Sequence, residues 1–224
     1  MLSSTIDSIY FPILESSLIL RNETMAGFLD TKLYSPTLPI LLRNPEPRDA
    51  PALSKLFSDP RNTQHDVATS ITPEQALTTI TRFRESAAAA VPTRVNLVVV
   101  LLPAVNSPDE VEVVGISGFG GIDEFEREVE GEKKKVRFAD VGVMLNEEWR
   151  GKGFAAESVR LSVDFAFEKL KTEGVSCQML EVNEAMVGLV DKKFGWRRVD
   201  SKEGEVRFEV EPEEWRVWNE RRSL

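Results

Sequence analysis

The spacing of hydrophobic residues changes period in the middle of the chain. Residues Phe138 to Leu145 form an apolar run rich in β-branched side chains, which predicts a strand buried on at least one face. From Phe154 to about Leu170, polar residues recur along one stripe while apolar residues fill the broad remainder, which predicts an amphipathic helix. A polar segment with two glycines separates the two patterns. The centre of the chain is therefore predicted to be a strand, a glycine-containing turn and a helix.

Similar patterns on either side predict a chain that mixes strands and helices. The predicted strands cover residues 38–43, 96–102, 112–119 and 178–182, with a closing hairpin of 196–200 and 205–210. The predicted helices cover about 51–57, 72–89 and 184–193, and one more begins at Pro212. Residues 59–72 are expected to form a loop, and the charged stretch 123–137 a solvated hairpin.

The turn after the central strand has the composition of an anion-binding site. Gly151 and Gly153 would leave the backbone N–H groups at the helix N-terminus uncovered, and Arg150 and Lys152 add positive charge. The natural ligand would be a phosphate or pyrophosphate. No Ser or Thr follows Lys152 as a P-loop requires, and Ala156 stands where a dinucleotide fingerprint needs its third glycine. The alternative is an ordinary surface turn.

Composition narrows the functional classes. A chain of 224 residues with 42% hydrophobic residues can bury a substantial core as one domain. A net charge of -9 argues against a nucleic-acid-binding protein. No apolar run is long enough to span a membrane. The single cysteine, Cys177, excludes an internal disulfide and suits a reducing compartment, so we expect a cytoplasmic protein without a membrane partner.

Two further segments leave alternatives open. Residues 1–37 are expected to form an N-terminal arm across the domain or a neighbouring subunit, or else a disordered tail. His65, the only histidine, cannot form a metal cluster by itself, so no metal site is expected. It would line an acceptor groove or lie on the surface.

The segment Arg150-Gly151-Lys152-Gly153-Phe154-Ala155 fits the pattern [RQ]-x-x-G-x-[GA] and resembles the coenzyme A loop of the GNAT superfamily of N-acetyltransferases. The wider string EWRGKGFAAES is similar to the branch that contains the ribosomal-protein N-terminal alanine acetyltransferases. The resemblance begins near residue 38, so we expect a GNAT domain over 38–224. It implies an α/β (α+β) fold with a central mixed, mostly antiparallel sheet flanked by helices. The fourth and fifth strands would splay to admit acetyl-CoA.

The resemblance also implies how acetyl-CoA would be held. The pyrophosphate would bind the amides of 151–155 together with Arg150 and Lys152, and the pantetheine arm would pair with Val143, Met144 and Leu145. The N–H of Val143 or Leu145 would stabilise the oxyanion. Asn183 would bond the pantetheine arm or fix the splay.

The catalytic groups are less completely implied. Asp140 lies in an otherwise apolar strand and is the expected base, because burial would raise its pKa; the alternative is a structural carboxylate. A water chain to Glu147, Glu148 or Glu112 is a further alternative. The tyrosine that protonates the thiolate in many family members is missing, since Val190 or Asp191 occupies that position.

The resemblance implies acetyl transfer from acetyl-CoA to a primary amine by direct attack in a ternary complex. The acceptor would be a protein N-terminus or an amine-bearing small molecule, and the chain a monomer or homodimer. A module that binds acyl-CoA without turnover is the main alternative, supported by the missing tyrosine. A pure interaction protein is a third, which would make the Arg150–Ala155 pattern accidental.

Overall fold

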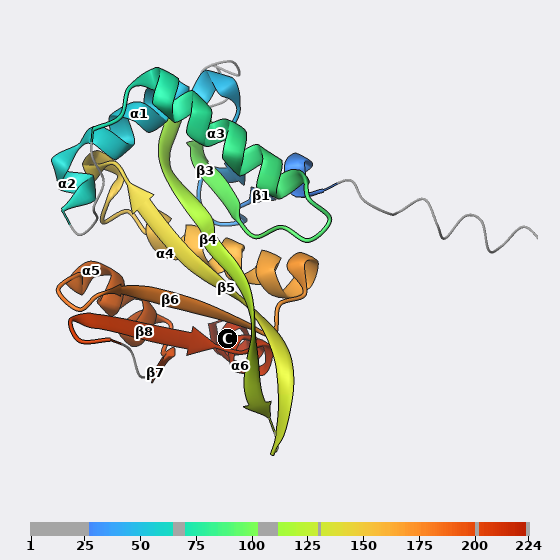
Figure 1. Ribbon diagram of the computed structural model, residues 1–224. Helices are drawn as coiled ribbons and strands as arrows, with labels where there is room; N and C mark the ends of the chain where they lie inside the picture. Colours follow the sequence, from blue (N-terminus) through green and yellow to red (C-terminus); the bar gives the residue numbers. More distant parts are fainter. Residues whose placement is uncertain (1–26, 65–69, 103–111, 130, 200–201, 223–224) are drawn as a thin grey trace, which may run out of the picture.

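The computed structural model describes residues 27–64, 70–102, 112–129, 131–199 and 202–222. These residues form one open sheet of eight strands in the order β1-β2-β3-β4-β5-β6-β8-β7 (Figure 1). Every neighbouring pair is antiparallel except β5 and β6. The strands are β1 (Lys32–Tyr34), β2 (Ile40–Arg43), β3 (Val95–Leu101), β4 (Glu112–Val129), β5 (Glu132–Leu145), β6 (Gly174–Leu180), β7 (Arg197–Val199) and β8 (Glu205–Val210).

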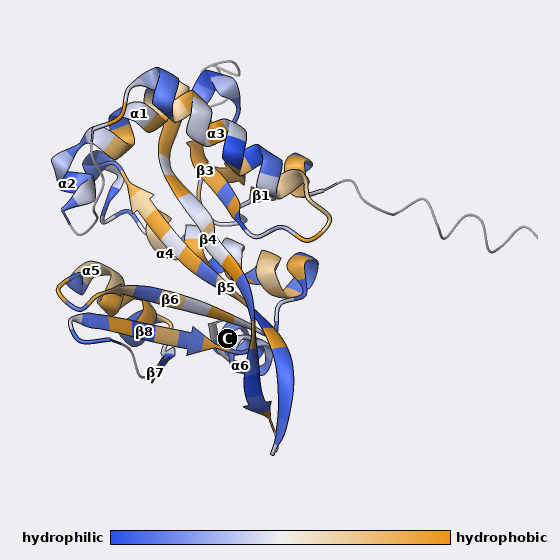
Figure 2. Cartoon of the chain, viewed as in Figure 1, coloured by the Kyte–Doolittle hydropathy of each residue, from blue (hydrophilic) through white to orange (hydrophobic). Residues whose placement is uncertain are grey.

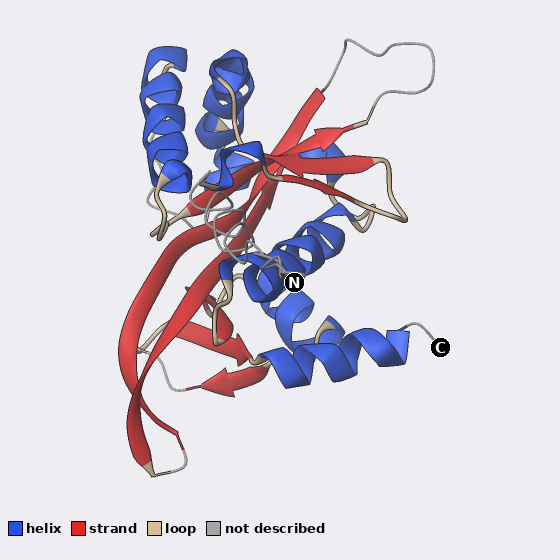
Figure 3. Ribbon diagram, turned by 90° about the vertical axis from the view of Figure 1, so that its right-hand side faces the viewer, coloured by secondary structure: helices blue, strands red, loops and turns tan. Residues whose placement is uncertain are grey.

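Helices cover the two faces of the sheet unequally. One group lies over β3 and β4, and the other packs against the opposite face (Figure 3). The first group is α1 (Ala50–Ser58), α2 (Pro60–Thr63) and α3 (Pro73–Ala88). The second is α4 (Phe154–Phe165) with its π-helical extension η5 (Ala166–Leu170), and α6 (Pro212–Arg222). The remaining short elements are η2 (Phe28–Asp30), η3 (Pro47–Asp49), η4 (Glu147–Trp149), α5 (Glu184–Val187) and η6 (Gly188–Lys193).

Two hydrophobic cores follow from the alternation of side chains along the strands. In β5, Val141 and Leu145 belong to the core under α4, whereas Met144 packs against the core under α1 and α3. Alternation in β6 and β8 likewise puts Val175, Cys177, Val206, Phe208 and Val210 in the core under α4 and α6. The intervening residues of these two strands face the other way.

We call that second surface of β6 and β8 the open face, because the described helices on this side lie over β3 and β4 instead (Figure 1). It carries Ser176, Gln178, Arg207 and Glu209. Asp140 lies on the same side of β5, since it alternates with the core residues Ala139 and Val141.

The predicted fold class is confirmed: the chain has a mixed, mostly antiparallel sheet flanked by helices, and its one parallel pair separates after three residues. The element boundaries differ most in three places. The charged hairpin continues β4 and β5, because their backbone ladder runs to its end; its tip is hydrophilic (Figure 2). β6 begins at Gly174, four residues before the predicted start at 178. The predicted loop 59–72 contains α2, whose first turn Asp59 caps by accepting from the N–H of Arg61.

Part of the predicted arm joins the sheet. Residues 28–34 form η2 and the edge strand β1, which pairs with β2. Residues 1–26 and His65 lie outside the described residues. Within the described part of the chain, helices are too short or too polar to cross a bilayer.

Candidate functional site

The two parallel strands at the centre of the sheet separate at Asp140. They pair over only three positions, Phe138 with Gly174, Ala139 with Val175 and Asp140 with Ser176. Beyond this point neither strand has the other as a partner. We call residues 141–145 of β5 and 177–180 of β6 the splayed segments. A one-residue bulge in β4, between Phe119 and Gly121, lies directly opposite the point of separation and adds local twist.

Backbone groups alternate in direction along a strand, which shows what the splayed segments expose. On the β6 side, the carbonyl of Arg137 accepts from Glu173; on the β4 side, the N–H of Asn146 donates to Val114. Odd-numbered residues of β5 therefore direct their backbone toward β6.

The predicted pantetheine contacts divide accordingly. Val143 directs both its N–H and its carbonyl away from β4, as does Val141, which the sequence analysis missed. Leu145 directs its N–H the same way, but its carbonyl already accepts from Nε of Arg150 at 3.1 Å. Met144 directs its backbone toward β4, so only its side chain is free for a ligand. The splayed edge of β5 thus offers a short ladder to an amide-bearing ligand.

Asp140 marks the point of separation with two hydrogen bonds. Its Oδ1 accepts from Oγ of Ser176 at 3.1 Å and from the N–H of Gln178 at 3.2 Å. Burial raises the pKa of the Asp140 carboxyl, and the Ser176 hydroxyl partly opposes that shift. Oδ2 has no hydrogen-bond partner among the described residues. The carboxylate is therefore held by one oxygen and available through the other.

The glycine turn predicted to bind an anion precedes α4 directly. Gly151 and Gly153 adopt φ values of 73° and 84°, in the left-handed region that glycine tolerates best. Within the described part of the chain, the N–H of Glu157 donates to the carbonyl of Gly153, and the N–H groups of 151–156 have no backbone acceptor. The amides of 151–156 are left for a ligand. Since α4 is twelve residues long, its dipole favours an anion there.

Aromatic rings border this turn. The Lys152 ammonium lies 4.3 Å from the centre of the Trp149 ring. That ring stacks on Phe154 with centroids 5.7 Å apart, and its Nε1 donates to Glu112. Lys152 is exposed, so its charge can reach a ligand. Phe154 is buried and contributes through its backbone, whereas Trp149 was not predicted for the site.

The side chain of Arg150, which was predicted to help hold the pyrophosphate, bonds to three groups of the protein. Its Nη2 donates to the carbonyl of Arg61 at 3.0 Å and to Oδ1 of Asn62 at 2.6 Å, while Nε binds the Leu145 carbonyl. The backbone N–H of Arg150 donates to the backbone carbonyl of Glu147. The side chain therefore ties α2 to the end of β5, and supports the anion site from outside.

Asn183 follows β6 and caps α5. Its Oδ1 accepts from the N–H of Met186 at 3.2 Å, and its own N–H donates to the carbonyl of Leu180. That carbonyl lies at the end of the splayed segment of β6. The side-chain NH2 has no hydrogen-bond partner among the described residues and is free for a ligand.

The alternative acids and bases lie far from Asp140. Glu147 is ion-paired with Arg61, and Glu112 is bonded to Trp149, both near the far end of β5. Val190 is buried and Asp191 is exposed on η6. Among the described residues Tyr34 is the one tyrosine, and it lies on the edge strand β1.

Two other predictions concern metals and the cysteine. The described residues hold no group of three or more His, Cys, Asp and Glu side chains suited to a metal. Cys177 is 2% exposed and packs in the core under α4, as predicted, and burial raises the pKa of its thiol.

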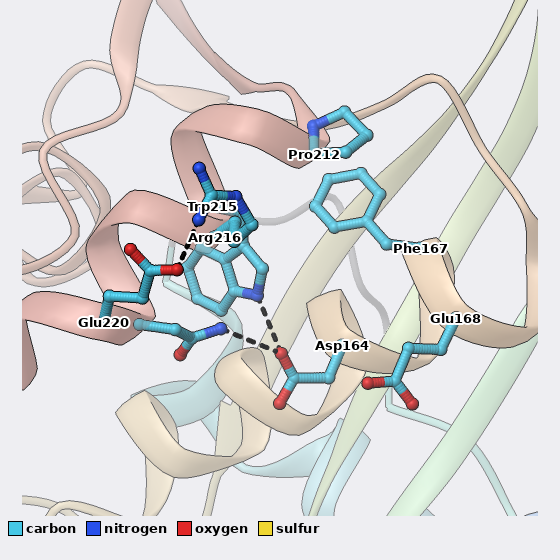
Figure 4. A pocket seen from close by; sticks show the side chains of 8 residues that line it. Asp164, Phe167, Glu168, Pro212, Trp215, Arg216 and Glu220 are labelled. Atoms are coloured by element: carbon cyan, nitrogen blue, oxygen red, sulfur yellow. Dashed lines mark hydrogen bonds and ion pairs between the residues drawn. The ribbon is translucent and has the colours of Figure 1, made fainter. Parts of the chain in front are cut away.

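A cavity of about 550 Å³ lies away from this site, between α6 on one side and α4 and η5 on the other. Figure 4 shows Trp215 and Asp164 in its wall. The indole N–H of Trp215 donates to Oδ1 of Asp164 at 2.7 Å. The cavity borders the helices of the opposite face from Asp140, so it has no part in the site described above.

Comparison with known proteins agrees with this geometry. Residues 40–196 match the model of the acetyltransferase (GNAT) domain family. The comparison with curated proteins found no match.

Three solved structures show the same fold at low sequence identity. A Bacillus anthracis acetyltransferase of the GNAT family is 16% identical, with a TM-score of 0.59, covering 82% of this chain and 99% of its own. The microcin C7 self-immunity acetyltransferase MccE, in complex with acetyl-CoA and AMP, is 12% identical, with a TM-score of 0.58 and coverage of 80% and 98%. A Vibrio cholerae structure named as a candidate ribosomal-protein-serine acetyltransferase is 13% identical, with a TM-score of 0.57 and coverage of 82% and 99%.

The strands that separate at Asp140, the uncovered amides at the start of α4 and the match over 40–196 lead to one conclusion: the chain belongs to the GNAT acetyltransferase family.

Proposed function

We propose that this protein transfers the acetyl group of acetyl-CoA to a primary amine, with Asp140 as the base. The observation that supports it best is the pairing of two features along one strand. β5 opens at Asp140 and ends five residues later, beside the anion site of α4. That interval is roughly 16 Å of exposed strand edge.

The residues present fit acetyl-CoA. The amides of 151–156 and Lys152 would hold the pyrophosphate, and the outward backbone groups of Val141 and Val143 would pair with the pantetheine amides. The side-chain NH2 of Asn183 would approach the same arm from β6. When bound, acetyl-CoA supplies a thioester whose carbonyl carbon is open to attack by an amine.

The chain's own groups have two tasks in the transfer. Free Oδ2 of Asp140 would take the proton that an ammonium must lose before its nitrogen forms the new C–N bond. The N–H of Val143 or Val141 would stabilise the oxyanion before the C–S bond breaks. The thiolate would leave without a tyrosine to protonate it, since a thiol of ordinary pKa is an adequate leaving group.

The acceptor is proposed to be a protein N-terminus or a small amine. The string around Arg150 supports the first, through its resemblance to N-terminal alanine acetyltransferases. A second candidate function is binding of acyl-CoA without turnover, which the lack of a described tyrosine near Asp140 favours.

A thermal-shift titration with acetyl-CoA and desulfo-CoA tests the proposal. A ligand that binds the native state must raise the melting temperature. Gly153→Glu places a carboxylate at the anion site and should abolish that rise. Gly131→Glu is a matched control, because Gly131 has a similar φ of 82°, lies on the hairpin tip and has no heavy atom within 4 Å of an added Cβ.

Stabilisation of the wild type and of Gly131→Glu, but not of Gly153→Glu, would support the assignment of the anion site. A thiol-release assay with amines and peptides would then separate an enzyme from a binding module. An unchanged melting temperature of the wild type at saturating acetyl-CoA would contradict both.

A further inference from the structure

Three arginines converge on one buried carboxylate at the open face. Glu209 of β8 has a side chain only 8% exposed. Its Oε1 accepts from Nε of Arg207 at 3.1 Å. Its Oε2 lies 3.2 Å from Nη1 of Arg127 on the β4 hairpin and 3.6 Å from Nη2 of Arg197 on β7. The β4 hairpin is far in sequence from β7 and β8, and the fold brings guanidinium groups from all three strands to Glu209.

The arginines are more exposed than the acid that gathers them. The side chains of Arg127 and Arg207 are each 27% exposed, and that of Arg197 is 46% exposed. The second nearby carboxylate, Glu211, lies 3.6 and 3.8 Å from Arg127 and Arg197. Three guanidinium groups therefore meet two carboxylates.

These contacts leave several N–H donors of the three guanidinium groups without a carboxylate partner. A guanidinium carries five N–H groups, and the closest approaches to Glu209 are made by Nη1 of Arg127, Nη2 of Arg197 and Nε of Arg207. Glu209 and Glu211 balance only two of the three positive charges. A second anion would satisfy the remaining donors.

This cluster lies on the same side of the sheet as the proposed base. Asp140 pairs with Ser176, which in turn pairs with Glu209. Two strand spacings place the cluster roughly 10 Å from Asp140. Asp123, exposed on β4 opposite Phe138, adds a second carboxylate at the Asp140 end. This surface is thus anionic at one end and cationic at the other.

We propose that the acceptor is an amine that also carries a carboxylate, bound by Arg127, Arg197 and Arg207 while its ammonium group lies near Asp140. This inference rests on the proposed function. Glu209 is a positioning residue that aligns the three guanidinium groups. The acceptor is either a small amino carboxylate or a peptide N-terminus with an acidic side chain nearby.

Two matched substrate series test the proposal and distinguish these sources. One compares ω-amino carboxylates of four to eight carbons with their terminal amides, which differ only in the far charge. The other compares the peptide amides Ala-Ala-Glu-Ala and Ala-Ala-Gln-Ala. In at least one series, kcat/KM for the carboxylate should exceed that for the amide by at least about tenfold.

Variants locate the effect. Arg127→Gln should remove most of that preference by raising KM for the carboxylate far more than KM for the amide. Arg198→Gln is the control: Arg198 is an exposed arginine on β7, but it pairs with Glu181. It should keep the full preference.

Equal kcat/KM for acid and amide in both series, or equal losses in Arg127→Gln and Arg198→Gln, would overturn the proposal. Binding provides a readout without turnover. With CoA present, carboxylates should raise the melting temperature of the wild type more than their amides do, and no difference would also overturn it. Failure of acetyl-CoA itself to bind would instead contradict the proposed function.

Discussion

The backbone N–H of Gln178 donates to the side chain of Asp140, at 3.2 Å, where a regular parallel ladder would have used the carbonyl of Val141. A carboxylate thus replaces the first missing ladder bond between β5 and β6. The N–H of Gln178 stays satisfied, although the strands separate. Asp140 therefore has a structural contact through Oδ1 and a proposed catalytic one through Oδ2, so the two interpretations of this residue are compatible.

Replacing Asp140 with Asn separates these two roles. The amide oxygen can still accept from Ser176 and Gln178, but the group cannot take a proton. We expect the acetylation rate to fall by about 100-fold or more while the affinity for acetyl-CoA stays within a few-fold. Steady-state kinetics together with calorimetric titration of acetyl-CoA would measure both. An unchanged rate would assign Asp140 a purely structural role.

The same carboxyl makes a prediction about stability and pH. Burial raises the pKa of Asp140 in the folded protein above its unfolded value, so its contribution to stability is full below the unfolded pKa, near 4. It is lost as pH rises through the folded pKa. The unfolding free energy of the wild type should therefore fall relative to that of Asp140→Asn over this window. Urea unfolding from pH 3.5 to 7 would test this, and a constant difference would argue against the raised pKa.

Ser176→Ala should shift the pH dependence of the reaction. The Ser176 hydroxyl donates to Oδ1 and favours the charged carboxylate, so its loss should raise the pKa of Asp140 further. The acidic limb of the kcat/KM profile should then move to higher pH. Thr at position 176 keeps the hydroxyl and is expected to restore the wild-type limb. A limb that does not move in Ser176→Ala would mean that Asp140 does not control it.

Arg150→Ala tests the structural role of that side chain. The variant loses the bonds to Leu145, Arg61 and Asn62, and its free energy of unfolding should drop by about 1 kcal/mol. Affinity for acetyl-CoA should fall much less than in Gly153→Glu, because the amides of the turn remain. Equal losses in both variants would instead indicate direct contact of Arg150 with the phosphates.

The contact between Trp215 and Asp164 in Figure 4 gives a prediction about stability alone. Asp164→Ala leaves the buried indole N–H without its acceptor and should cost about 1–3 kcal/mol. In Trp215→Phe that N–H is absent, so Asp164→Ala should cost less in this background. A double-mutant cycle by urea unfolding measures the coupling, and strictly additive losses would contradict it. Acetyl-CoA affinity should not change.

Much of the site could be predicted because it is local in sequence. The strand before the turn, the two glycines of positive φ and the start of α4 occupy consecutive residues, and each follows from short-range preferences. The mixed α/β fold class and the burial of Cys177 could also be predicted, because both follow from the short-range pattern of apolar residues. Asn183 could be picked out from the sequence because the apolar run stops there; it follows β6 and caps α5.

The errors arise where distant strands meet. The strand β6 was predicted to begin at 178, since Ser176 and Gly174 interrupt its apolar pattern, so the Ser176 and Gln178 contacts with Asp140 were missed. The length of the β4–β5 ribbon was missed because its charged residues pair across the hairpin, as Lys135 does with Glu124 at 2.8 Å. The bonds from Arg150 to Arg61 and Asn62 were also missed, because no local pattern indicates them.

By itself the sequence determined the glycine turn at the start of α4, the strand that leads into it and the family to which the chain belongs. These depend on backbone preferences and hydrophobic periodicity over a few consecutive residues. Only the tertiary structure decided which backbone groups face away from β4, which oxygen of Asp140 is free and which arginines surround Glu209. Each of those depends on the register between strands, which is set by the packing of the whole sheet and not by any one segment.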